Sequence, residues 1–203
     1  MAGDLYRAPS QGLPAGPVPV HALVLLPAAG SEEEIMTMKP GVVGDAFFSP
    51  GDRCRMWLSR TWDKPKGYVL FTGLNPSKAG ADVDDMTVTK GMGFARLWGF
   101  GGTVHVNAYP YIATNPADLK HCTDEEIEKN DATVLDMARG ATLVVLAWGS
   151  FPKFKQRFWK VARLLAPFNP VCVGRTKDGF PQHISRIGYE TPRELWRAAA
   201  VAE

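Results

Sequence analysis

The stretch FTGLNPSKAGADVDD (71–85) decides the fold, because a buried strand ends there and a helix begins a few residues later. The run that leads into it, YVLFTGLN (68–75), is nearly continuous in apolar residues, which is typical of a strand buried on both faces. Pro76 disfavours the helical conformation for Asn75 and has no N–H for a sheet. Asp84 and Asp85 suit the N-terminus of a helix. We therefore predict a strand–loop–helix unit over residues 68–98.

Three more apolar runs of the strand type follow, and helical segments separate them. These runs are GTVHVNAYP (102–110), TLVVLAWG (142–149) and NPVCVGR (169–175). Helices are predicted after Asp85, from a capping box at 123–126 to Gly140, from Pro152 to Pro167, and after a second capping box at 191–194. This alternation predicts a three-layer α/β/α fold around a central four-stranded parallel sheet.

Two segments of different character precede these strands. GDAFFSPGDRCRMWLSRTWD (44–63) has two aromatic-rich runs around a Ser-Pro-Gly-Asp turn, which predicts an N-terminal β-hairpin. Residues 1–43 are expected to form a partly flexible extension, because residues 1–17 are rich in Pro and Gly. We expect a single α/β domain over residues 44–203.

Composition excludes several classes of protein. The 203 residues are 45% hydrophobic and 22% charged, which is ample for a core and unlike a disordered chain. The apolar run VPVHALVLLPAAG (18–30) is too short to span a membrane, so we expect no membrane partner. The three cysteines are scattered and no histidine pair has metal-ligand spacing, so we expect no metal and no cofactor in a reducing cytoplasm.

The candidate site follows from the predicted topology. Parallel α/β sheets bind ligands beyond the carboxyl ends of their strands. Amide, aromatic, cationic and imidazole side chains converge there: Asn75, Asn107, Tyr109, Trp148, Lys177 and His183. Such groups suit a planar heterocycle attached to phosphate, which points to DNA or a nucleotide as partner. Residues 151–203 carry ten basic and four acidic residues, a balance that suits either phosphate contact or solvated helix faces.

Several candidate residues also have a purely structural interpretation. Asn75 can simply shape a turn before proline, and Asp84 and Asp85 can be helix N-caps. Trp148 can be a core residue. His105 alternates with valines inside a predicted strand, which favours a structural role for it.

Four segments resemble the uracil-DNA glycosylase superfamily. GLNPS (73–77) is similar to its first motif, VHVNAYPYIATNP (104–116) to its second strand, LVVLAWGS (143–150) to its third, and FPQHISR (180–186) to its second motif. The aromatic hairpin, GLNPSKAGADVDDMT (73–87), GFARLWGFGG (93–102) and TKDGFPQH (176–183) carry a closer similarity, over about residues 45–190, to a bacterial and phage family known only as a domain of unknown function. The chain departs from the glycosylase pattern at Ser77, which replaces a glycine, and at Ile184, which replaces a proline.

The resemblance implies a DNA-base-processing enzyme with a glycosylase-like pocket that hydrolyses an N-glycosidic bond at a pyrimidine. The catalytic candidates are Asn75, which would orient water, His183, which would stabilise charge on the base, and Asp85. The residues expected to contact the base are Gly73, Leu74, Asn107, Tyr109 and Trp148. The residues expected to contact phosphate are Ser77, Lys78, Arg175, Lys177 and Arg186.

Two other functions remain open on the same residues. A phage-type hypermodification enzyme would replace a pyrophosphate on 5-hydroxymethyl-uracil with an amine or amino acid, and Lys177 and His183 would then bind the leaving group. A non-catalytic nucleotide- or DNA-binding module would use the pocket without a reaction.

Overall fold

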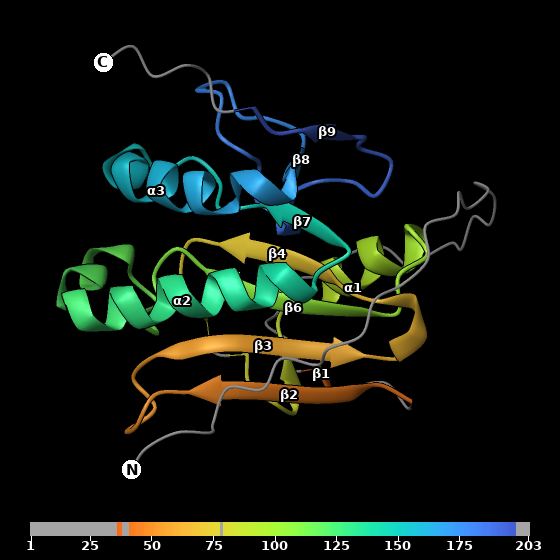
Figure 1. Cartoon of the computed structure of the whole chain (residues 1–203), viewed down its shortest axis with the longest axis horizontal. Helices are drawn as coiled ribbons and strands as arrows, with labels where there is room; N and C mark the ends of the chain where they lie inside the picture. Colours follow the sequence, from red (N-terminus) through yellow and green to blue (C-terminus); the bar gives the residue numbers. More distant parts are fainter. Residues whose placement is uncertain (1–35, 38–40, 78, 198–203) are drawn as a thin grey trace.

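A seven-stranded mixed sheet organises the protein (Figure 1). The computed structural model describes residues 36–37, 41–77 and 79–197. The order in the sheet is β2-β3-β6-β4-β7-β8-β9, and a separate two-stranded ribbon pairs β1 with β5. The strands are β1 (Met36–Thr37), β2 (Val43–Phe48), β3 (Arg55–Thr61), β4 (Val69–Gly73), β5 (Val83–Asp84), β6 (Gly102–Asn107), β7 (Leu143–Leu146), β8 (Val171–Val173) and β9 (Arg193–Leu195).

The predicted four-stranded parallel sheet is wrong in its extent. The four predicted strands, β6, β4, β7 and β8, do pair in parallel, but antiparallel strands border them on both sides. The predicted hairpin forms as the antiparallel pair β2–β3, and β3 then joins the sheet with Leu58 opposite His105. The sheet gains these strands because a parallel edge strand still has unpaired N–H and C=O groups on its outer side.

Helices cover both faces of the sheet (Figure 1). They are α1 (Met86–Leu97), α2 (Asp124–Gly140) and α3 (Lys155–Leu165), with five short 3-10 segments η1 (Lys64–Lys66), η2 (Pro116–His121), η3 (Pro152–Phe154), η4 (Ala166–Phe168) and η5 (Ile184–Arg186). Leu70 and Leu146 face α2 and α3, whereas Phe71 and Val145 face α1. Strand residues alternate between the two cores because successive side chains point to opposite faces.

The helix starts after Asp85 and Thr123 agree with the capping signals, whereas the helix predicted from Pro152 begins as the 3-10 segment η3 and becomes α3 only at Lys155. Asp85 caps α1 by accepting from Val88 N at 2.8 Å, and Thr123 and Glu126 form the capping box of α2. The predicted terminal helix after 191–194 is wrong within the described residues, because Arg193–Leu195 pair with β8 as β9. Burial of Trp196, which is 6% exposed, fixes this segment against the core instead.

Two buried arginines on β3 contact the loop that leads from β4 to α1. Arg60 is fully buried, and its Nε donates to Asp84 Oδ1 at 2.7 Å. Its Nη2 donates to the carbonyls of Gly80 and Val83 at 2.7 and 3.1 Å. Arg55 Nη1 donates to the Ala79 carbonyl at 2.6 Å. The contacts of Arg60 therefore fix this loop to the sheet just before it delivers Asp85 to the start of α1.

Most of the predicted N-terminal extension (1–43) lies outside the described residues; of its last part, Met36–Thr37 pair with β5, and Val43 begins β2. In the part of the chain that the structure describes, no helix is long and apolar enough to cross a membrane.

Candidate functional site

A cavity of about 110 Å³ opens at the carboxyl ends of β4, β6 and β7, on the face that α1 covers. Residues from the strand ends, the start of α1, β3 and the loop after β8 form its wall. They are Arg55, Phe71, Gly73, Asn75, Ser77, Asp85, Thr87, Val88, His105, Val106, Asn107, Ala147, His183 and Ile184. The cavity therefore brings together the predicted catalytic residues Asn75, Asp85 and His183, which lie as far as 108 positions apart in the chain.

The side chain of Asn75 is held by its nitrogen. Nδ2 donates to the carbonyl of Ala113 at 2.7 Å and to that of Pro76 at 3.0 Å. Within the described residues Oδ1 accepts no hydrogen bond. The amide is thus anchored in one orientation, and its oxygen is available to a water or a ligand.

The hydrogen bonds of His183 define its tautomer. The backbone N–H of Ser185 donates to Nδ1 at 3.4 Å, and the Ser185 hydroxyl lies 2.7 Å from the same nitrogen. A neutral ring whose Nδ1 accepts carries its proton on Nε2. Burial lowers the pKa of His183, the charge of Arg186 lowers it further, and Asp85 opposes both effects. At neutral pH His183 is therefore a neutral N–H donor.

Asp85 is shared between the helix start and the cavity. One carboxylate oxygen accepts from Val88 N, and the other accepts from the hydroxyl of Ser77. The carboxylate is held in place because each of its two oxygens accepts one of these hydrogen bonds. Ser77, predicted to contact phosphate, thus serves as a donor to Asp85.

Gly73 and Asn107 end two neighbouring strands side by side. A Cβ at Gly73 would lie 2.8 Å from the terminal atom of the Asn107 amide, so only glycine leaves that amide its place. With its nitrogen turned inward, the Asn107 amide donates to the carbonyls of Val106 and Asn75, each at 3.3 Å. Its oxygen then remains as an acceptor at the cavity wall.

The structure does not bring Leu74, Tyr109 and Trp148 to this cavity. Leu74 follows Gly73 and so points to the opposite face of the sheet. Trp148 is fully buried in the α2–α3 core and stacks on Phe158 with ring centroids 4.9 Å apart. Tyr109 packs edge-on against Phe154 on that same side, at 5.5 Å. These three side chains pack a core.

The predicted phosphate-contacting residues are dispersed. Arg175 is engaged by Glu194, with Nε 2.9 Å from Oε1, and lies over the ring of Trp196. Lys177 is exposed in the turn after β8, and Arg186 is exposed in η5, close enough to affect His183. Lys78 lies outside the described residues.

Eight of the fourteen cavity residues were not among the predicted site residues, and two of these eight, His105 and Arg55, have basic side chains. His105 stacks on Phe71 with centroids 5.3 Å apart, and burial is the main cause that lowers its pKa to about 3. Its place was visible in the sequence, because it lies two residues before Asn107 in one strand and therefore shares its face. No sequence pattern indicated that Arg55 would line the cavity, because Arg55 belongs to the aromatic hairpin and not to one of the predicted parallel strands.

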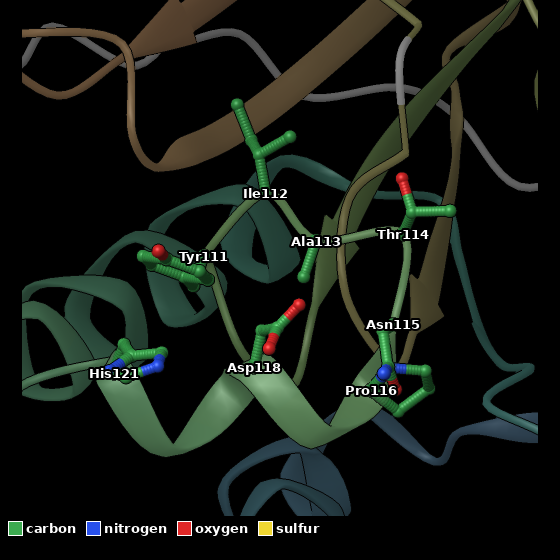
Figure 2. Close-up of a pocket in the computed structure, with 8 residues that line it drawn as sticks. All are labelled: Tyr111, Ile112, Ala113, Thr114, Asn115, Pro116, Asp118 and His121. Atoms are coloured by element: carbon green, nitrogen blue, oxygen red, sulfur yellow. The ribbon is translucent and has the colours of Figure 1, made fainter.

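A second, open depression of about 650 Å³ lies on the outer side of the segment that follows β6 (Figure 2). Tyr111 and His121 stand on one side of it and Asn115 on the other, with Asp118 between them. Ala113 belongs to its wall, and the carbonyl of Ala113 is the group that anchors Asn75. The segment 111–115 therefore lines the depression and also contacts the cavity residue Asn75 through Ala113.

The fold and the site define a mixed α/β protein with a small polar cavity at the carboxyl edge of its parallel strands. A family model described as "Protein of unknown function (DUF1643)" matches residues 55–183, and the chain belongs to that family. This confirms the predicted membership of a family of unknown function. The match covers β3 through His183 and thus nearly every cavity residue. No curated protein and no solved structure matches the chain.

Proposed function

We propose that the protein processes a pyrimidine base in DNA, and that the reaction is hydrolysis of the N-glycosidic bond. The observation that carries the proposal is the pairing of Asn75 and His183 in one cavity. One offers a fixed acceptor oxygen and the other a neutral N–H donor. The similarity of GLNPS and FPQHISR to two motifs of the uracil-DNA glycosylase superfamily supports it, because these two segments supply that pair.

The two groups divide the reaction between them. Asn75 Oδ1 accepts from a water and directs its oxygen at C1′ of the sugar. The water oxygen forms a bond to C1′, the C1′–N bond breaks with its electron pair on the base, and the water proton leaves to a carboxylate or to the base nitrogen. His183 Nε2–H donates to the base oxygen on which the charge develops. A neutral imidazole suits this role because it keeps its proton when the site is dry.

The polar wall supports a base as the ligand. The amide of Asn107 is fixed by hydrogen bonds to backbone carbonyls and offers its oxygen as an acceptor. The stacked rings of Phe71 and His105 form an aromatic part of the cavity wall. Extrusion of one nucleotide from the stack would be needed to reach a cavity of this size. Asp85 lines the same cavity as Asn75 and His183, and its charge acts on His183, so we assign the water proton to this carboxylate.

A second function is favoured by the buried cation Arg55 in the cavity wall. In a hypermodification reaction an amine would attack the methylene carbon of pyrophosphorylated 5-hydroxymethyl-uracil. The C–O bond would break, and pyrophosphate would leave with the electron pair. A cation in the cavity would stabilise that leaving group, and the base would stay in the DNA.

The test uses duplex and single-stranded DNA that contains uracil or 5-hydroxymethyl-uracil. Abasic sites are counted as strand breaks after alkali. We expect breaks with the wild type, and a loss of about 100-fold or more in rate for Asn75→Ala and His183→Ala. Asn115→Ala and His121→Ala are matched controls, because both residues are exposed and lie outside the cavity.

Each outcome has one interpretation. Breaks that persist in both cavity variants refute the assignment of Asn75 and His183. Intact strands that carry altered bases support the hypermodification reaction instead. Salt-dependent DNA binding with neither product identifies a binding module and refutes both enzymatic proposals.

A further inference from the structure

Three arginines of the described chain are buried, and two of them are fully engaged. Arg60 pairs with Asp84 and donates to three carbonyls. Arg157 pairs with Asp131 through Nη1 and Nη2, at 3.1 and 2.5 Å, and its Nε donates to the Ala108 carbonyl at 2.6 Å. These two follow the ordinary rule that a buried charge is compensated by an opposite charge and by hydrogen bonds.

Arg55 does not follow this rule. The residue is 4% exposed, yet among the described residues its side chain makes a single hydrogen bond, to the Ala79 carbonyl. Its Nε is buried without a partner, and no carboxylate of the described residues lies within 4.0 Å of it. The charge of Asp85 acts on Arg55, but the oxygens of Asp85 already accept from Ser77 and Val88. Arg55 is also the one of the three that lines the cavity.

A guanidinium has five N–H donors in a planar fork that matches the oxygens of carboxylates and phosphates. Burial lowers the pKa of Arg55 to about 10, so the group is still charged at neutral pH. An uncompensated buried cation destabilises a fold, and such a cation in a cavity wall indicates a ligand that completes it.

We propose that Arg55 binds an anionic oxygen group, a carboxylate or a phosphate, of the molecule that occupies the cavity. The inference deepens the proposed function and rests on the same cavity, because it makes the substrate class a negatively charged pyrimidine. The negative charge belongs either to a substituent on the base or to the phosphate of the nucleotide.

Calorimetric titration near neutral pH separates these sources with two pairs of probes. Uracil and 5-carboxyuracil differ by a charge on the base, and deoxyuridine and its 5′-monophosphate differ by a charge on the sugar. Inorganic phosphate is the fifth probe and needs no base. Arg55→Met removes the charge at similar volume, and Arg53→Met is the control, because Arg53 is a half-exposed arginine of the same hairpin that pairs with Glu126.

We expect Arg55→Met to weaken binding of the charged member of one pair by about 10- to 100-fold and to leave the neutral member unchanged. The pair of probes whose charged member loses affinity identifies whether the charge lies on the base or on the sugar phosphate. The unfolding stability of Arg55→Met should equal or exceed that of the wild type, because a buried cation has been removed. Arg53→Met should bind every probe like the wild type.

Equal binding of all charged probes by the wild type and Arg55→Met overturns the inference. So does a marked loss of stability in Arg55→Met, which would make the arginine a structural clamp for Ala79. Phosphate binding that depends on Arg55, without binding of any pyrimidine, would retain the anion site and refute the proposed base chemistry.

Discussion

The ion pair between Arg60 and Asp84 is predicted to be the most sensitive polar contact in the loop that positions the site. Arg60 is fully buried, and the side chain of Asp84 is 5% exposed. The change Asp84→Asn keeps the shape and one acceptor oxygen but removes the negative charge. Arg60 would then become a buried cation without a counter-charge, while its bonds to Gly80 and Val83 persist.

The expected cost is about 3 kcal/mol of unfolding free energy, the lower end for a buried pair that loses one partner, because an acceptor remains. For a chain of this length that corresponds to a fall in Tm of about 6–12 °C. The control is Glu125→Gln in the exposed i,i+4 pair with Lys129, whose side chains are 76% and 65% exposed. Its expected cost is below about 0.5 kcal/mol.

Urea unfolding followed by tryptophan fluorescence and far-UV circular dichroism measures both variants. Equal slopes of free energy against urea for wild type and variant would show that only stability has changed. A cost for Asp84→Asn within about 0.5 kcal/mol of the Glu125→Gln control would refute the view that this ion pair clamps the loop to β3.

Two further predictions concern His105. Its folded pKa of about 3 lies below the ordinary unfolded value, so its contribution to stability is present above about pH 6.5 and is lost as the pH falls. His105→Gln should reduce the slope of unfolding free energy between about pH 5 and 6.5 by up to about 1.4 kcal/mol per pH unit, and an unchanged slope would contradict the burial of a neutral ring. Gly91→Ala in α1 would place a Cβ 2.6 Å from His105 Cε1, so we expect it to destabilise by about 1–3 kcal/mol despite better helix propensity. The same change in a His105→Ala background should instead stabilise, and loss in both backgrounds would refute the clash.

Local sequence patterns predicted much of the fold. The nearly continuous apolar character of 68–75 and 142–149 identified two parallel strands, and the capping chemistry of Asp85 and of Thr123 placed two helix starts. These signals depend on residues a few positions apart, which a sequence displays directly. The sequence does not display which strands lie next to each other in the sheet. The pairing of β3 with β6, for example, joins segments about 45 positions apart and is decided by tertiary packing.

The site divides in the same way. Period-two alternation from Gly73 would have placed Leu74 on the far face, and from Asn107 it places His105 on the near one. The sequence could therefore have predicted both positions, but Leu74 was expected to contact the base and His105 was given a structural role. Trp148 illustrates a different limit, because a strand end can contribute to the rim or to the core, and only the position of α3 decides. Arg55 reaches the cavity through a sheet pairing that no local pattern reveals.

The central claim is that Asn75 and His183 act together on a pyrimidine base held in the cavity. Mass analysis that resolves each nucleoside of a uracil-containing DNA, together with the free bases released, tests it most directly. With the wild type, free base should appear in the same amount as abasic sites, and neither product should form with Asn75→Ala. A DNA whose bases are neither released nor altered, across uracil and 5-hydroxymethyl-uracil substrates, would contradict it.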